Sequence, residues 1–176
     1  MRQLLLLRHA KSSWDDSSLP DRDRPLNNRG RRSVARMRLA MHEFGLTPDL
    51  VLVSAAKRTM QTLEALEPWD DVPLIEPMDS LYLASATQLL EALRAVADTV
   101  RSVMLIGHNP GMHDLAFALA APPATPAERA AERSLAEGFP TCGLAEFTVA
   151  AAWSLLEPGG GRLQRFLTPR GLEAAD

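Results

Sequence analysis

Two histidines of this chain stand directly after short apolar runs. His9 follows Arg8 and the four leucines at 4–7, and His108 follows the run at 102–107. Continuous apolar runs of this length are typical of strands that are buried on both faces of a parallel sheet. Such sheets bind ligands just beyond the carboxyl ends of their strands. We therefore expect both imidazoles at one edge of the sheet, where a neutral ring can act as a nucleophile.

Two arginines are placed in the same way. Arg8 immediately precedes His9, and Arg58 follows the apolar run at 50–53 and opens a predicted helix, whose first backbone amides favour anions. Guanidinium groups stay ionised, and their paired N–H groups match phosphate oxygens. With the two histidines, they predict a pocket for a dianion such as phosphate. A zinc site is disfavoured, because no carboxylate or cysteine stands at ligand spacing and the arginines would repel the cation.

The other histidines and the single cysteine are less indicative of a site. His42 lies in an arginine-rich segment and is expected to be solvated, and His113 could approach the pocket but is expected to have no functional role. Cys142 is predicted to be a small core residue rather than a reactive thiol, and one cysteine cannot form an intramolecular disulfide.

Length and composition predict a single globular domain over residues 1–176. A net charge of −3 gives no general attraction to nucleic acid or to an anionic membrane. No run approaches the roughly 18 apolar residues of a membrane span, and the N-terminus starts on a strand-like run rather than a signal peptide. We therefore expect a cytoplasmic protein without nucleic-acid or membrane partners.

Strand-type and helix-type patterns alternate through most of the chain. This alternation predicts an α/β fold: a three-layer α/β/α sandwich with a mainly parallel central sheet and helices on both faces. Residues 11–28 are predicted to form an ordered loop, residues 127–135 a short helix or an exposed insertion, and residues 168–176 a frayed tail. The predicted strands are 4–7, 50–53, 72–75, 103–106, 143–149 and 163–167, and the predicted helices are 29–44, 60–66, 87–100 and 112–119.

Three motifs give the chain a family resemblance. Leu-Leu-Arg8-His9-Ala10 resembles the Arg-His-Gly signature of the histidine phosphatase, or phosphoglycerate mutase-like, superfamily. The segment Ser-Ala-Ala-Lys-Arg-Thr-Met-Gln-Thr at 54–62 resembles its Ser-x-x-x-Arg-x-x-Gln-Thr element, and Gly-His-Asn at 107–109 its second-histidine element. The segments 8–14, 23–30 and 107–111 are similar to the small SixA-type phosphohistidine phosphatase branch. Beyond about residue 120 the match is mainly one of length.

The resemblance implies a metal-independent phosphatase that needs no cofactor and forms a phosphohistidine intermediate. It assigns the nucleophile to His9 and implies that His108 is protonated or at least donates a hydrogen bond to the phosphoryl group. The phosphate-binding side chains that it implies are Arg8, Arg24, Arg58, His108 and Asn109.

The acid that protonates the leaving group has no clear candidate in the sequence. Larger members of the superfamily place a glutamate after the third strand, and residues 75–82 lack that pattern. Asp21 is our first choice, and the alternatives are Asp23, Asp15, Asp16, Glu76 and Asp79.

The missing glutamate bears on the substrate. A phosphorylated imidazole can leave as a neutral ring, so P–N cleavage demands less of a protein acid than P–O cleavage. The absence of a lid insertion also indicates an open pocket, which suits phosphohistidine on a protein. The alternatives are a small-molecule phosphomonoesterase or phosphoanhydride hydrolase and, in another class, a non-catalytic phosphate-binding adaptor.

The arginine-rich segment 29–38 could recruit an acidic partner, although we expect a solvated basic face. The oligomeric state and the role of residues 121–140 stay open.

Overall fold

The four-leucine run forms the central strand of a mixed sheet. In the computed structural model, which describes residues 1–175, six strands pair in the order β3-β2-β4-β1-β5-β6. Strands β3, β2, β4 and β1 run parallel, whereas β5 is antiparallel to β1 and β6 to β5. The strands are β1 (Arg2–Arg8), β2 (Leu50–Ser54), β3 (Leu74–Met78), β4 (Ser102–Gly107), β5 (Leu144–Val149) and β6 (Gly161–Leu167).

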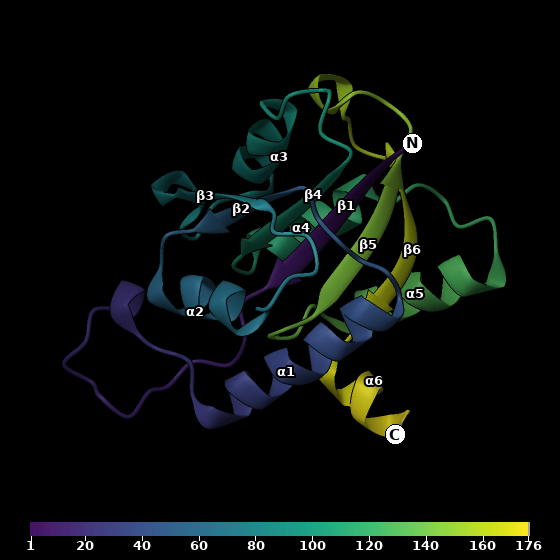
Figure 1. Ribbon diagram of the computed structural model, residues 1–176. Helices are drawn as coiled ribbons and strands as arrows, with labels where there is room; N and C mark the ends of the chain where they lie inside the picture. Colours follow the sequence, from purple (N-terminus) through teal and green to yellow (C-terminus); the bar gives the residue numbers. More distant parts are fainter. Residues whose placement is uncertain (176) are drawn as a thin grey trace.

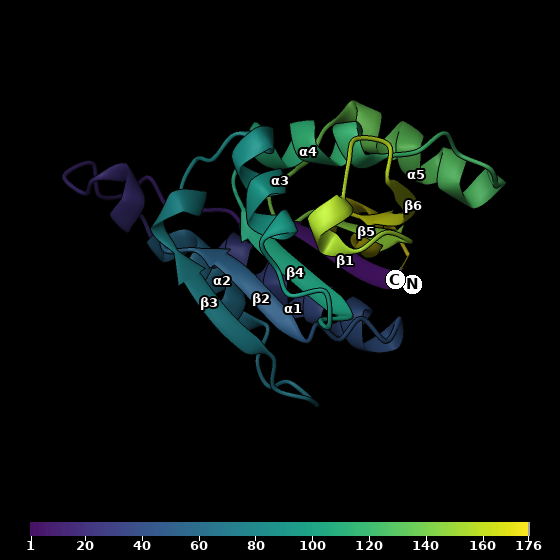
Figure 2. The ribbon, with the colours of Figure 1, turned by 90° about the horizontal axis from the view of Figure 1, so that it is seen from above.

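Helices cover both faces of this sheet, as Figures 1 and 2 show. One face packs against α1, α2 and α6, and the other against α3, α4 and α5. The helices are α1 (Asn28–Glu43), α2 (Lys57–Ala65), α3 (Ala86–Arg94), α4 (Gly111–Leu119), α5 (Pro126–Glu137) and α6 (Pro169–Ala174). Three short 3-10 helices are η1 (Asp21–Asp23), η2 (Asp79–Leu81) and η3 (Trp153–Leu155).

The alternation of side chains along β1 explains why its leucines are all apolar. Leu4 and Leu6 point into the core layer beneath α3 and α4, whereas Leu5 and Leu7 point into the layer beneath α1 and α2. All four leucines have no exposed surface. A strand buried on both faces therefore has a continuous apolar sequence. The predicted α/β sandwich with a mainly parallel sheet is confirmed.

The C-terminal tail differs from its prediction as a frayed segment. Residues 169–174 form helix α6, which begins with Pro169 and is capped by Thr168, whose side chain accepts a hydrogen bond from the backbone N–H of Gly171. Leu172 packs against the core beneath α1, and α6 lies beside α1 in Figure 1. The prediction is wrong over these residues because tertiary packing stabilises a helix too short to persist alone. Residue 176 lies outside the described residues.

Other differences are shifts of element boundaries. The third strand is two to three residues later than predicted, at Leu74–Met78, and it forms an edge of the sheet where Leu74 and Ile75 are exposed. Residues 127–135 are helical within α5, which Thr125 and Glu128 begin with a capping box. The pairing predicted between residues 143–149 and 163–167 is confirmed as β5 with β6. Among residues 1–175, no helix combines the length and apolarity that a membrane crossing requires.

Candidate active site

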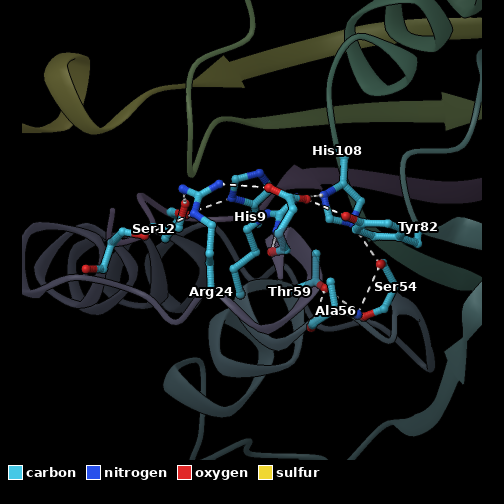
Figure 3. Close-up of polar contacts among 12 residues, drawn as sticks. His9, Ser12, Arg24, Ser54, Ala56, Thr59, Tyr82 and His108 are labelled. Atoms are coloured by element: carbon cyan, nitrogen blue, oxygen red, sulfur yellow. Dashed lines mark hydrogen bonds and ion pairs between the residues drawn. The ribbon is translucent and has the colours of Figure 1, made fainter. Parts of the chain in front are cut away.

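The ends of β1 and β4 bring the two histidines together. Arg8 is directly opposite Gly107 in the parallel register, so His9 and His108 both follow at the same edge. The backbone N–H of His9 donates to the carbonyl of Gly107 at 3.1 Å, which fixes the two strand ends together. The imidazole centroids lie 5.2 Å apart (Figure 3). The predicted meeting of the strand-end histidines at one edge is therefore confirmed.

The His9 ring is held in one tautomer. Its Nδ1 lies 2.8 Å from the carbonyl oxygen of Ala10, so Nδ1 carries the proton and donates, and Nε2 keeps its lone pair. Burial, as the largest cause, and the nearby guanidinium charges of Arg58, Arg8 and Arg24 together lower the pKa of His9 to about 4, although the Ala10 hydrogen bond acts in the opposite sense. At neutral pH, His9 is therefore uncharged, with a free nitrogen available for attack.

His108 is also neutral in this structure. Arg58 Nη2 donates to His108 Nδ1 at 3.3 Å, so the proton is on Nε2, which donates to the Ser54 hydroxyl oxygen at 2.7 Å. Burial, repulsion from His9 when that ring is protonated, and the charge of Arg58 together lower the pKa of His108 to about 3, although the Asp21 carboxylate acts in the opposite sense. Burial among cations therefore favours the neutral ring in the free protein, and the expected hydrogen bond from His108 to a phosphoryl group stays a prediction.

Arg58 and Arg24 both converge on one carboxylate. Arg58, in the first turn of α2, donates to the backbone carbonyl of Asp21 at 2.8 Å and to its Oδ2 at 3.0 Å. Arg24 donates to Asp21 Oδ1 at 3.0 Å, to the carbonyl of Ser13 and to the Ser12 hydroxyl. Its guanidinium also stacks on the Trp14 ring, 3.2 Å from the ring centroid.

Arg8 is oriented from the other side of the site. Its Nη1 donates to the carbonyl of Phe139 at 3.0 Å. Its Nε is buried and has no hydrogen-bond partner among the described residues. Arg8 is therefore held by Phe139, whereas Arg24 and Arg58 are engaged with Asp21.

Asp21 is the one acid candidate that contacts these arginines. The Tyr82 hydroxyl donates to its Oδ2, and this bond, followed by those from Arg24 and Arg58, holds the pKa of Asp21 at about 2. Asp21 is therefore ionised at neutral pH. The other candidates lie elsewhere: Asp15 and Asp23 are exposed, Asp16 binds Ser18, Glu76 is exposed on β3, and Asp79 pairs with Arg22.

Asn109 does not present its amide to the pocket. Its Nδ2 donates to the carbonyl of Phe139 at 2.8 Å, and its Oδ1 accepts from the backbone N–H of His113. The His113 ring contacts the Leu135 carbonyl at 2.8 Å, which links α4 to α5. Asn109 therefore holds the segment after α5 that also orients Arg8, and its contact with phosphate stays a prediction.

The two remaining residues singled out in the sequence lie outside the phosphate-binding group. His42 is exposed, 3.5 Å from Asp70. Cys142 is fully buried, and burial raises the pKa of its thiol to about 12, as expected for an unreactive core cysteine.

Two polar residues at the site have no counterpart in the predictions. Tyr82 follows η2, and its ring meets the His108 ring edge-on at 5.3 Å between centroids. Ser54 is the last residue of β2 and anchors His108. Ser54 lies in the motif segment 54–62, whereas Tyr82 lies in segment 75–82, which lacks the superfamily's glutamate pattern. Their contacts depend on strand register and on the turn after β3.

A cleft of about 780 Å³ adjoins this site. It lies between the start of α1, the end of α5 and the start of α6, and Phe139, whose carbonyl orients Arg8, lines it. Its charged lining residues are Lys11, Arg29, Arg170, Glu137 and Glu173. Within residues 1–175, no three His, Cys, Asp or Glu side chains gather in a way that could hold a metal ion.

Comparisons with known proteins agree with this geometry. Residues 4–78 match the model of the histidine phosphatase superfamily (branch 1). An uncharacterised protein of Mycobacterium tuberculosis is 37% identical over 164 residues, which cover 93% of this chain and 100% of the relative. A candidate phosphohistidine phosphatase SixA from Agrobacterium tumefaciens superposes with a TM-score of 0.79 and 32% identity, over 96% of this chain and 98% of that one. The protein histidine phosphatase SixA in complex with tungstate superposes with a TM-score of 0.75 and 25% identity, over 97% and 99%. This chain is therefore a phosphatase of the histidine phosphatase superfamily and belongs to its SixA-type branch.

Proposed function

We propose that this phosphatase removes the phosphoryl group from phosphohistidine on a protein, through a phosphohistidine intermediate on His9 and without a metal ion. The observation that carries the proposal is the state of His9. Its Nδ1–H is held by Ala10, and Nε2 is unprotonated beside the three arginines. This is the form of histidine that attacks phosphorus.

The reaction has two displacements at phosphorus. In the first, the His9 Nε2 lone pair forms a P–N bond while the P–N bond of the substrate breaks and its electron pair returns to the leaving imidazole. In the second, water attacks, the bond to His9 breaks and inorganic phosphate leaves. Arg8, Arg24 and Arg58 offset the charge on the equatorial oxygens in both steps, so the arginines supply the positive charge that many phosphoryl-transfer enzymes take from a metal.

His108 has a supporting role in this scheme. In the free enzyme it holds the Arg58 guanidinium through Nδ1 while Ser54 anchors the opposite ring nitrogen. A dianion bound beside it favours the protonated imidazole, which can then donate to a phosphoryl oxygen.

Two observations favour a protein phosphohistidine as substrate. One similar structure is a protein histidine phosphatase with bound tungstate, a tetrahedral oxyanion like phosphate. The 780 Å³ cleft is not lined by the histidines or the three arginines of the site, but it meets the site at Phe139, whose carbonyl holds Arg8. Its size accommodates a ligand far larger than a phosphoryl group, such as a segment of polypeptide.

The test combines intermediate trapping with a substrate panel. We expect base-quenched enzyme that has reacted with a phosphohistidine peptide to carry phosphate on His9, and we expect His9→Ala to lose both label and turnover. His42→Ala, a change at an exposed histidine, should leave both unchanged. Turnover should persist in the presence of a metal chelator. A label on another residue would refute the mechanism, and a preference of about tenfold or more for sugar phosphates, equivalent to about 1.4 kcal/mol, would refute the proposed substrate.

A further inference from the structure

The Asp21 carboxylate occupies hydrogen-bond donors that a phosphoryl group needs. Its two oxygens accept from Arg24 and Arg58, both buried guanidiniums that face the histidines. A carboxylate and a phosphoryl group present similar pairs of oxygens to a guanidinium fork. Substrate and Asp21 therefore compete for the same N–H groups.

Tyr82 holds Asp21 independently of the arginines. Its hydroxyl donates to Asp21 Oδ2, and its ring centroid lies 5.5 Å from the Arg22 guanidinium and 5.8 Å from that of Arg58. Arg22 is itself paired with Asp79, which lies in η2 just before Tyr82. Tyr82 therefore stays in place when Arg58 changes its partner.

We propose that the phosphoryl group displaces Asp21 from Arg24 and Arg58, and that Tyr82 retains the displaced carboxyl beside the leaving group, where it takes up a proton and acts as the acid. This inference rests on the proposed function and adds the identity of the acid and its positioning residue. The groups that face Asp21 come from four segments: Arg24 after η1, Arg58 in α2, Tyr82 after η2 and His108 after β4.

The exchange of partners supplies the driving force for proton uptake. In the free enzyme the hydrogen bond from the Tyr82 hydroxyl and the two guanidiniums keep Asp21 ionised. With a dianion on those guanidiniums, the carboxylate loses two cations and gains two negative charges nearby, and both changes favour its protonated form. Asp21 therefore becomes protonated when substrate binds.

Protonated Asp21 then gives its proton to the leaving group as the bond to phosphorus breaks. When the substrate P–N or P–O bond breaks, the released electron pair on the leaving atom takes the Asp21 proton. Asp21 becomes a carboxylate again and can accept a proton from the water that attacks phosphohistidine 9. Water thus supplies one hydroxyl to phosphorus and one proton to Asp21. When phosphate leaves, Asp21 releases that proton to solvent and its carboxylate pairs again with Arg24 and Arg58, which restores the free enzyme.

Sulfate binding tests the competition without requiring turnover. Sulfate is a tetrahedral dianion that does not titrate near neutral pH, so proton uptake on binding reports protein groups alone. We expect Asp21→Asn to bind sulfate about tenfold more tightly than the wild type, about the contribution of one charge-assisted hydrogen bond. Calorimetry in buffers of different ionisation enthalpy should show that this variant takes up about one proton less. Asp23→Asn, the neighbouring acid without an arginine contact, should match the wild type.

Tyr82→Phe tests the positioning role through the leaving group. We expect the single-turnover rate of His9 phosphorylation to fall about a hundredfold with phenyl phosphate, as for loss of a general acid, and to change little with p-nitrophenyl phosphate, whose leaving group needs no proton. Equal losses on both substrates, or equal sulfate affinity and proton uptake in Asp21→Asn and wild type, would overturn the inference. Failure of His9 to become phosphorylated by any substrate would instead refute the proposed function.

Discussion

Acidification between pH 6.5 and 4.5 should destabilise this protein sharply. His9 and His108 have pKa values of about 4 and about 3 in the folded state, against an ordinary value of 6.5. In this window the unfolded chain binds two protons that the folded chain does not. The free energy of unfolding therefore falls by about 1.4 kcal/mol per pH unit for each histidine, or about 3 kcal/mol for the pair.

The sign and the window follow from the direction of the shifts. A histidine with a lowered pKa contributes its full stability above pH 6.5 and loses it as the pH falls toward the folded value. Between pH 6.5 and 4.5 the two histidines together lower the free energy of unfolding by about 4 kcal/mol, because the unfolded imidazoles are only half protonated at pH 6.5; this loss approaches the total stability of many domains. Asp21, with a pKa of about 2, contributes stability that is lost only below its ordinary value of 3.8, so its titration lies outside this window.

Urea unfolding curves measured at pH 7, 6 and 5 would give the slope of stability against pH. His9→Asn and His108→Asn should each reduce the slope of stability against pH by about half. Each variant removes one histidine, and with it one proton from the difference between the numbers bound by the unfolded and folded states. His42→Asn should not change it, since His42 is exposed. Sulfate should restore stability at pH 5 by favouring the protonated rings. A wild-type slope that survives in both active-site variants would refute the reasoning.

Three further predictions concern the scaffold. Gly30→Ala should lower kcat/KM about a hundredfold, since its Cβ would lie 2.2 Å from the Lys11 carbonyl oxygen and displace the loop after His9; Arg32→Ala on the exposed face of α1 is the control. Glu128→Ala should cost about 2 kcal/mol in urea unfolding, because backbone N–H groups before α5 lose their acceptor; wild-type stability would contradict this. Cys142 should react with Ellman's reagent at pH 8 only in urea, and rapid labelling of the folded protein would disprove its burial.

The strands that carry the site could be predicted from the sequence because they are buried on both faces. β1, β2 and β4 each contain an uninterrupted apolar run of four residues, and the polar residues after these runs mark one edge of the sheet. β3 was misplaced, since it is an edge strand whose exposed positions give no such run. α6 was missed because its stability comes from packing against α1 rather than from its own short sequence.

The charge and direction of the site side chains could not be predicted in the same way. The sequence placed His108 at the site, but its neutral state results from burial and from the contact with Arg58. Asn109 follows His108 directly, yet its amide turns to Phe139, thirty residues away in the chain. Tyr82 reaches Asp21 through a turn that no motif specifies. These features depend on tertiary contacts between segments that are distant in sequence.

The open edge of the sheet at β3 bears on self-association. An edge strand offers unpaired backbone groups to any other strand, and exposed Leu74 and Ile75 would add apolar contact area to such a pairing. Pro77 interrupts this edge because proline has no backbone N–H, and Glu76 adds a charge beside it. Replacing Pro77 with valine would complete the row of donors, and the variant would aggregate at lower protein concentration than the natural chain.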